Sequence, residues 1–281
     1  MTVRIVTDST CDLPEEIIAE LGIKVIPLYI NFGDDSYLDG IELSRREFYE
    51  MLPDYESPPT TAVPGTEVFA RTYEQLASEG AAEILSVHVS STVSATHDVA
   101  HTVAQEMGAV PVTTFDGRQI TIGTGFLVIA AAKAAAEGRS VTEIVPILEE
   151  MGARIHSFAA LDTVEFLRRS GRVTVLQYGL STLLNIKPLI MMHKGEMEGE
   201  RVRTRQGCIQ RMIDLVTDLG PLEQLAVVHT NAPEAAEALR QQAKHLFPKG
   251  AESYTVEVTP VIGTHVGPGA VGLVAVQARE E

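Results

Sequence analysis

The sequence predicts an α/β fold with two domains, an N-terminal parallel sheet with helices on both faces and a C-terminal mixed α/β domain. Strand-like and helix-like segments alternate through the first half, as in sheets built from right-handed crossovers. The second half adds a hairpin pattern and further strands, which predicts a mixed sheet. The 281 residues are 45% hydrophobic and 21% charged, enough for two medium-sized cores. We set the boundary at residue 155, giving domains of 1–155 and 156–281.

The first predicted elements are apolar runs followed by capped helices. RIVT is typical of a buried strand, and the helix in CDLPEEIIAELG is expected to have Asp12 as its N-cap, with Glu15 three residues later. KVIPLYINF is a second apolar run. Ser44 and Glu47 form the capping pattern of the helix SRREFYEML. Two strand–helix pairs therefore open the chain.

The same alternation continues to the end of the first domain. EVFARTYEQLASEG is typical of a helix and EILSVHV (83–89) of a buried strand. A helix is expected from about Ser94, the strand VPVTTF follows, and a long apolar helix covers 121–137. These segments complete a parallel sheet with helices on both faces.

The second domain is predicted to be richer in strands. After the helix VTEIVPILEEMG, the strand-like SFAALD opens it, and IKPLIMMHKGEMEGERVR predicts a hairpin that turns at Lys194-Gly195. A helix, the strand QLAVVHT, another helix and two final strands complete the chain. VIGTHVGPGAVGL (261–273) is predicted as a glycine-rich loop between apolar runs.

Charge and composition exclude several classes of protein. The formal net charge of -16 opposes binding to nucleic acid and to anionic membrane surfaces. Cys11 and Cys208 provide neither a disulfide framework nor a metal cluster, and the histidines lack metal-ligand spacing. GFLVIAAAKAAAEG reaches Lys133 too early to span a bilayer, and MTVRIVTDST lacks the apolar core of a signal peptide. We expect a cytoplasmic protein without a metal, a cofactor or a transmembrane segment.

Hydroxyl side chains follow the predicted parallel strands. Ligands bind beyond the carboxyl ends of such strands, where hydroxyls and helix-start amides can hold a carboxylate through neutral hydrogen bonds. Local roles are the alternative: a helix N-cap for Ser94, a turn cap for Asp8 and ordinary loop positions for the threonines. The candidate positions are Asp8-Ser9-Thr10, Ser90-Ser91, Ser94, Asp116, Thr60 and Thr61.

No common catalytic motif is present. The chain has no GxGxxG or GxxxxGKS phosphate loop and no GxSxG nucleophile elbow. The closing segment places His265 among three glycines and a proline, which suits either a tight corner of a sheet or a backbone that approaches a ligand closely. A small-molecule phosphotransferase or hydrolase that uses His265 or Ser94 covalently is the enzymatic alternative.

Seven segments together resemble the DegV family of bacterial fatty-acid-binding proteins over essentially the whole chain. They are, in order, VTDSTCDLP, PTTAVPG, VSSTVSATHDVA, FDGRQITIGTG, EFLRRSGRV, IKPLI..HKG and VIGTHVGPGAVGL. The resemblance implies a long-chain fatty acid, such as palmitate, held in a tunnel between the two α/β domains. It also implies a lipid carrier rather than an enzyme, which presents the acyl group to a separate fatty acid kinase.

The resemblance also assigns site residues. Thr61, Ser94 and His265 match the residues that the family uses around the carboxylate, and Arg172 matches an arginine that supports this site. His265 is then expected to donate a hydrogen bond from a loop that closes over the site, and a protonated imidazole would strengthen that bond. The chain departs from the family pattern at Ala62, Val63, Gly65, Ala95 and Gly117.

Two further expectations concern the acyl tail and the kinase. LSTLLNI and PLIMM are candidate tunnel walls, with ordinary core packing as the alternative. Seven arginines of the second domain lie in two stretches of an acidic chain. Of these, Arg201, Arg203 and Arg205 are expected to dock the kinase, with solvent-exposed local ion pairs as the alternative.

Overall fold

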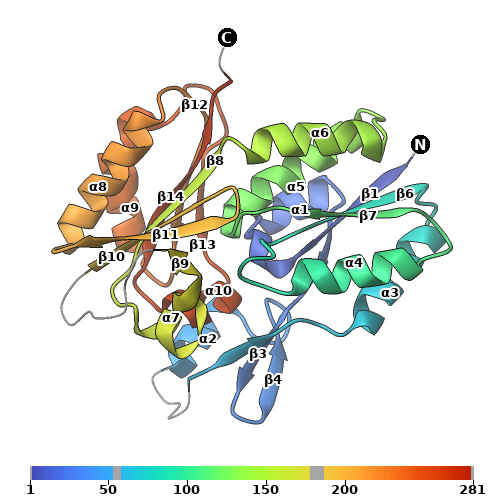
Figure 1. Ribbon diagram of the computed structural model, residues 1–281, viewed down its shortest axis with the longest axis horizontal. Helices are drawn as coiled ribbons and strands as arrows, with labels where there is room; N and C mark the ends of the chain where they lie inside the picture. Colours follow the sequence, from blue (N-terminus) through green and yellow to red (C-terminus); the bar gives the residue numbers. More distant parts are fainter. Residues whose placement is uncertain (1, 53–57, 178–186, 280–281) are drawn as a thin grey trace.

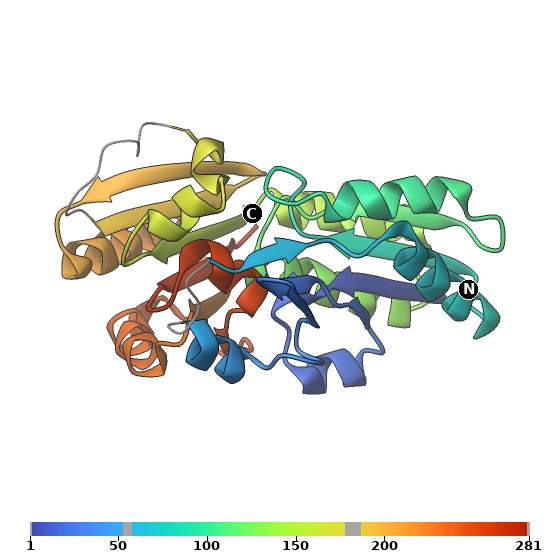
Figure 2. The same cartoon turned by 90° about the horizontal axis from the view of Figure 1, so that it is seen from below.

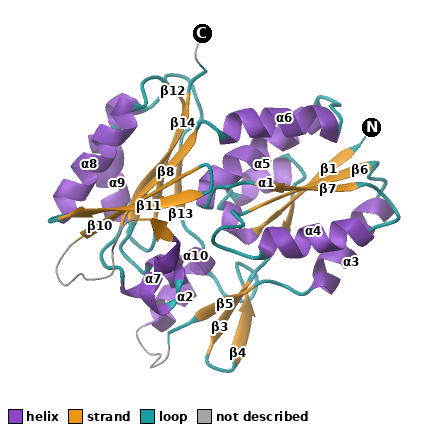
Figure 3. Ribbon diagram, viewed as in Figure 1, coloured by secondary structure: helices purple, strands orange, loops and turns teal. Residues whose placement is uncertain are grey.

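The computed structural model describes residues 2–52, 58–177 and 187–279, and within them it has two large sheets and one small one (Figures 1 and 3). One large sheet is parallel and the other is mixed, which confirms the predicted α/β class. The two sheets and their helices lie side by side when seen from below (Figure 2). They divide the chain near residue 155, although their independence as domains stays a prediction.

The parallel sheet has helices on both faces. Leu85 and Val87 pack toward α5 and α6, whereas Ile84, on the alternate face, packs toward α3 and α4. Its strands, in spatial order, are β2 (Lys24–Ile26), β1 (Val3–Asp8), β6 (Glu83–His88) and β7 (Val112–Asp116). The covering helices are α1 (Glu15–Glu20), α5 (Thr121–Ala136) and α6 (Val141–Gly152) on one face, and α3 (Thr66–Ser78) and α4 (Thr96–Glu106) on the other.

The predicted N-cap role of Asp12 is wrong. Pro14 occupies the N-cap position of α1, and Asp12 follows a short 3-10 turn in the left-handed conformation, with φ 50°. Its carboxylate instead accepts hydrogen bonds from Thr121 and Thr259. A contact across 247 residues of chain therefore outweighs the local capping pattern.

The apolar run KVIPLYINF is not one strand but crosses between two sheets. β2 ends at Ile26, and β3 (Tyr29–Phe32) joins the small antiparallel sheet after Pro27, which cannot donate a ladder hydrogen bond. β4 (Asp35–Leu38) and β5 (Thr60–Ala62) complete that sheet, and α2 (Arg45–Met51) packs on it. The capping box predicted for α2 from Ser44 and Glu47 is confirmed.

The mixed sheet contains seven strands and includes the predicted hairpin. β10 and β11 pair antiparallel around Lys194 and Gly195, whose φ angles are 51° and 83°. In spatial order the strands are β13 (Tyr254–Glu257), β12 (Leu222–His229), β14 (Val271–Gln277), β8 (Ile155–Ala160), β10 (Lys187–His193), β11 (Glu196–Val202) and β9 (Leu176–Gln177). Helices α8 (Arg205–Asp218) and α9 (Pro233–Gln242) cover the outer face.

The inner face of the mixed sheet packs on α5, which lies between the two large sheets (Figure 1). Two glycines of α5 permit the close approach. A Cβ at Gly125 would lie 2.6 Å from the carbonyl oxygen of Cys11, on the side of the parallel sheet. A Cβ at Gly123 would lie 3.2 Å from Oγ of Ser157, in strand β8. Gly125 thus allows close packing on the side of the parallel sheet, and Gly123 allows it on the side of the mixed sheet.

The segment that carries His265 is a short helix and not the predicted glycine-rich loop. α10 (Pro260–Val266) begins at the N-cap Thr259, whose side chain accepts a hydrogen bond from the N–H of Val261. Proline suits the first turn of a helix, and Gly267, at φ 77°, ends it. α10 packs against α2, β3, β5 and α7 (Glu165–Arg169).

We expect Gly125→Ala to destabilise the protein although alanine favours helices. The added Cβ would meet a backbone carbonyl that cannot move alone, which typically costs about 1–3 kcal/mol. The control is Gly152→Ala at the end of α6, where the nearest atom is 3.9 Å away, and helix propensity predicts a gain of up to about 1 kcal/mol. Urea unfolding measures both, and equal effects would contradict the packing argument.

Candidate functional site

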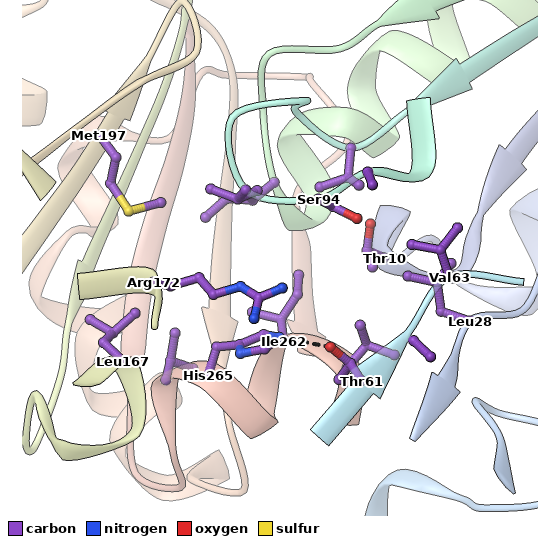
Figure 4. Close-up of a pocket in the computed structure, with 17 residues that line it drawn as sticks. Thr10, Leu28, Thr61, Val63, Ser94, Leu167, Arg172, Met197, Ile262 and His265 are labelled. Carbon is purple, nitrogen blue, oxygen red and sulfur yellow. Dashed lines mark hydrogen bonds between the residues drawn. The ribbon is translucent and has the colours of Figure 1, made fainter. Parts of the chain in front are cut away.

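A cavity of about 190 Å³ lies between the carboxyl ends of β1 and β6 and the helices α7 and α10 (Figure 4). Its walls are mostly apolar and its polar side chains come from five separate segments. The apolar residues are Leu28, Ala62, Val63, Val89, Val93, Ala95, Ile120, Leu167, Met197, Val261, Ile262 and Val266. The polar residues are Thr10, Thr61, Ser94, Arg172 and His265.

Thr61 and His265 form the one hydrogen-bonded pair among the labelled polar side chains in Figure 4. Oγ1 of Thr61 lies 3.0 Å from Nε2 of His265, which joins strand β5 to the last turn of α10. Arg172 follows α7 and extends toward them from the same side of Figure 4 as His265, with one guanidinium nitrogen held 2.8 Å from the carbonyl oxygen of Ser170. The structure thus brings Thr61, Arg172 and His265 together at one end of the cavity.

His265 is neutral at neutral pH, contrary to the idea of a protonated imidazole. Burial, followed by the positive charge of Arg172, lowers the pKa of His265 to about 4. Charging the ring would also place a proton on Nδ1, for which no hydrogen-bond acceptor is found in the described part of the chain. The positive charge at this end of the cavity therefore comes from Arg172, and His265 contributes a neutral donor or acceptor.

Ser94 lies across the cavity from this pair. Its hydroxyl is 2.8 Å from that of Thr96 and accepts a hydrogen bond from the Thr96 N–H at 3.3 Å. Ala95, rather than Ser94, occupies the N-cap position of α4. In Figure 4 the hydroxyls of Ser94 and Thr10 point toward each other. Thr10 was among the hydroxyls noted in the sequence but not among the predicted site residues.

A buried chain of polar groups fixes the position of Thr10. Asp8 accepts hydrogen bonds from the hydroxyl of Thr10 at 2.5 Å and from the N–H of Val89 at 3.1 Å. Its other partner, His88, lies 2.9 Å away and in turn contacts Ser86 at 2.7 Å. Burial raises the pKa of the Asp8 carboxyl group, but the hydrogen bond and electrostatic attraction of His88, together with the hydrogen bonds from Thr10 and the N–H of Val89, outweigh burial and place this pKa below its usual value. Asp8 therefore ties the cavity ends of β1 and β6 together.

A second cavity of about 290 Å³ lies on the other side of the same polar residues. It shares Thr61, Arg172 and His265 with the first cavity, so these three side chains stand between the two spaces. The rest of its lining comes from the proline-rich loop, α7 and α10: Pro58, Pro59, Thr60, Phe166, Arg169, Ser170 and Thr264. A ligand group held by the three shared residues could be reached from this side.

Only part of the predicted tunnel wall can be placed. LSTLLNI lies outside the described residues, and PLIMM is part of strand β10. Ile190 and Met192 pack in one cluster with the cavity residues Leu167 and Met197, whereas Met191 faces α8 on the opposite side of the sheet. PLIMM thus supports the wall from behind through alternate residues.

The structure explains the residue type at several positions near the cavity that the sequence alone did not explain. Ile262 and Val266 line the cavity one helical turn apart, a pattern hidden by the surrounding glycines. The departures Ala62, Val63 and Ala95 also line it. At the departure Gly117, a Cβ would lie 2.7 Å from the carbonyl oxygen of His88, so close packing favours glycine there.

Most of the arginines are engaged in local contacts. Arg205 donates to the carbonyl oxygens of Ala160 and Gly269 at 3.1 and 2.6 Å and to Asp162 at 3.1 Å, which makes it a clamp within the second domain. Arg201 and Arg203 are exposed at the end of β11. The remaining pairs are Arg168 and Arg169 with Glu165, and Arg211 with Glu200.

The described residues contain neither a membrane-spanning helix nor a metal-binding cluster. None of the described helices is long and apolar enough to cross a membrane. Within the same part of the chain, no three His, Cys, Asp or Glu side chains are grouped so that they could hold a metal ion.

The fold and the cavity define a two-sheet α/β protein with a buried site, apolar along its walls and polar at one end, which suits an amphipathic ligand. The chain belongs to the DegV family. The family model described as "Uncharacterised protein, DegV family" matches residues 2–278. A DegV domain-containing protein of Streptomyces coelicolor is 38% identical over 275 residues, covering 97% of each chain. Protein DegV of Bacillus subtilis is 31% identical, covering 97% of this chain and 98% of that one.

Solved structures of DegV proteins share the whole fold. A DegV family protein of Thermus thermophilus, described as fatty acid binding, has a TM-score of 0.89 at 32% identity and covers 99% of this chain and 100% of its own. DegV of Bacillus subtilis, described as a fatty acid binding protein, has a TM-score of 0.90 at 30% identity with the same coverage. These structural neighbours bind fatty acids.

Proposed function

We propose that this protein binds a long-chain fatty acid, such as palmitate, with its carboxylate at Thr61, Ser94 and His265 and with Arg172 supporting that end. The proposal extends to a cytoplasmic carrier that presents the acyl group to a separate fatty acid kinase and does not itself catalyse a reaction. The observation that carries it is the cavity, whose apolar walls end at a cluster of hydroxyls, a neutral imidazole and one guanidinium. The fatty-acid-binding DegV neighbours support the same ligand class.

The two ends of the cavity suit the two ends of a fatty acid. Burying about fourteen methylenes contributes on the order of 11 kcal/mol before the costs of association and ordering are subtracted. The tail therefore supplies affinity, and the polar cluster sets orientation. A further cavity of about 50 Å³ adjoins the first, and the two share Ile120, Ile262 and Val266. Small movements of these side chains would lengthen the apolar space.

Local geometry favours a carrier over the enzymatic alternative. The Thr61–His265 pair resembles a nucleophile with its base, but an active pair of this kind needs a third group that orients the imidazole. No such partner is found for Nδ1 of His265 in the described ranges. Ser94 contacts Thr96 instead of a histidine. These contacts support binding by Thr61, Ser94 and His265 without a covalent step.

The second cavity supports presentation of the carboxylate to a kinase. A carboxylate held at Thr61 and His265, beside Arg172, would face the first cavity on one side and the second cavity on the other. Arg169 lines the second cavity, and arginine suits a phosphoryl group because its planar fork binds two oxygens. Arg201 and Arg203 remain candidates for docking the kinase. Arg205 is a weaker candidate because its guanidinium is held within the domain.

The direct test is to measure bound palmitate in the parent protein and in three head-group variants. We expect the parent to hold one palmitate per chain, recovered by solvent extraction and mass spectrometry. Thr61→Val, Ser94→Ala and His265→Ala should each weaken binding by about 1.5–3 kcal/mol, because each loses a hydrogen bond to a charged group. The control is Ser91→Ala, which follows the same strand as Ser94 but contacts Asp116 at 2.6 Å.

One outcome would contradict the proposed ligand class, and another would contradict only the proposed position of the carboxylate. A parent protein that holds no acyl chain, even after incubation with palmitate, would remove the ligand class. A parent that binds while all three variants bind equally well would place the carboxylate elsewhere.

The docking proposal is tested by a double variant, Arg201→Ala with Arg203→Ala. We expect palmitate loading to stay unchanged and acyl phosphate formation by a fatty acid kinase with ATP to slow by about three- to tenfold, because charge steers association. The matched control removes the same charge from exposed first-domain positions, Arg71→Ala with Arg139→Ala. If both double variants react alike, Arg201 and Arg203 are solvent-exposed side chains without a docking role.

A further inference from the structure

Two buried carboxyl groups, Asp12 and Asp39, hold the start of the helix that carries His265. Thr259, the N-cap of α10, donates its N–H to Asp12 at 2.8 Å and its hydroxyl to Asp39 at 2.5 Å. The same hydroxyl oxygen accepts the N–H of Val261 at 3.3 Å. The amide and the hydroxyl of Thr259 are therefore both used to fix the first turn of α10.

Asp12 joins α10 to two other segments that line the cavity. Its second oxygen accepts the hydroxyl of Thr121 at 2.6 Å, and Thr121 directly follows the cavity residue Ile120. Thr121 has φ 48°, rare for a β-branched residue, so the bond to Asp12 supports an unfavourable backbone conformation. Asp12 itself lies two positions after the cavity residue Thr10. One carboxyl group thus ties three cavity-lining segments.

Asp39 adds a fourth segment. Its N–H donates to the carbonyl oxygen of Leu28 at 2.9 Å, and Leu28 lines the cavity. The hydroxyl oxygen of Ser9 accepts the N–H of Leu28 at 3.2 Å and also contacts the Asp39 side chain. Both carboxyl groups are nearly inaccessible, with exposed fractions of 2% for Asp12 and 5% for Asp39.

We propose that Asp12 and Asp39 are positioning residues that hold α10, and with it His265, against the acyl cavity, so that their protonation controls how firmly the cargo is retained. The control of cargo retention rests on the proposed function, in which the cargo is a fatty acid. The positioning of α10 can be measured without any ligand.

The sign of the pH effect follows from burial. Burial raises the pKa of Asp12 to about 7, which Arg45 and the bonds from Thr121 and Thr259 offset only in part. Burial also raises the pKa of Asp39. If α10 moves away and water reaches Asp12, its pKa returns toward the ordinary 3.8. The closed position is therefore fully favoured at low pH, weakens as the pH rises toward 7, and changes no further above it.

Other groups near Asp12 and Asp39 also titrate, so a variant is needed that removes only the pH effect of Asp12. Burial lowers the pKa of His265 to about 4, which opposes the effect of Asp12 between about pH 4 and 6.5. Burial also raises the pKa of Cys11 to about 12 and lowers that of His229. The titratable and charged groups that interact with Asp12 or Asp39 are Asp8, Cys11, Arg45 and Tyr49. His229 and Glu257 interact in turn with Arg45 or Tyr49.

Asp12→Asn is the informative variant because it resembles the protonated acid at every pH. Its carbonyl oxygen can still accept the N–H of Thr259, and its amide can donate to the hydroxyl of Thr121. Asparagine also tolerates the left-handed conformation of this position. A second pair of variants distinguishes the hydrogen bond of the Thr259 hydroxyl from the shape of the Thr259 side chain. Thr259→Val keeps the shape and removes the hydrogen bond to Asp39, whereas Thr259→Ser keeps the hydrogen bond.

Two readouts are compared between about pH 5 and 8. One is the release rate of radiolabelled palmitate to excess albumin. The other is the amide hydrogen exchange of residues 259–266 without ligand, corrected for the intrinsic effect of pH. The release rate of the parent relative to Asp12→Asn should rise by up to about tenfold per pH unit and level off above about pH 7. Thr259→Val should release and exchange faster than Thr259→Ser. Ile213→Val, on the buried face of α8, is the control for a general loss of core packing.

The outcomes separate the two proposals. The positioning role would be overturned if the ratio of the palmitate release rates of the parent and Asp12→Asn did not change with pH and the amide hydrogen exchange of residues 259–266 were equal in Thr259→Val and Thr259→Ser. If the parent holds no palmitate but exchange at 259–266 follows the expected pattern, the fatty-acid proposal fails and the positioning of α10 by Asp12 and Asp39 stands.

Discussion

Helix α5 has no polar face, since twelve of its sixteen residues are buried, and a helix that is apolar all round must be covered on every side. The parallel sheet covers one side and the mixed sheet covers another, each approaching through one glycine, Gly125 or Gly123. This packing fixes the distance between the two sheets. The cavity occupies the space beyond the end of α5, where Ile120 and the strand ends of the first sheet meet α10 and α7.

The polar end of the cavity combines one positive charge with neutral hydrogen-bonding groups. Burial, and then the positive charge of Arg172, lower the pKa of His265 and keep its ring uncharged, so Arg172 and His265 do not repel each other as two cations. Hydroxyls then set geometry, and Arg172 supplies the charge that would balance a carboxylate. In a chain with a net charge of -16, a single local cation of this kind restricts where an anionic head group is stable.

Local sequence signals predicted most of the secondary structure because their causes are local. The capping box of α2, the hairpin at Lys194-Gly195 and the apolar helix α5 are set by nearby residues. The role of Asp12 was missed because its partner is 247 residues away, and α10 was missed because its glycines conceal a cap at Thr259. The resemblance named Thr61, Ser94, Arg172 and His265, which the fold brings to one cavity, but Thr10 and Ile262 required the structure.

We propose that one cavity holds an acyl chain with its carboxylate at Thr61, Ser94 and His265. The most direct measurement is a crystal structure with palmitate that carries bromine on its terminal carbon, located by anomalous scattering. We expect the carboxylate within hydrogen-bonding distance of those three side chains and the bromine among the apolar residues of the cavity or of the small space behind α10. A reversed chain, or a ligand in the groove between β7 and α6, would contradict the claim.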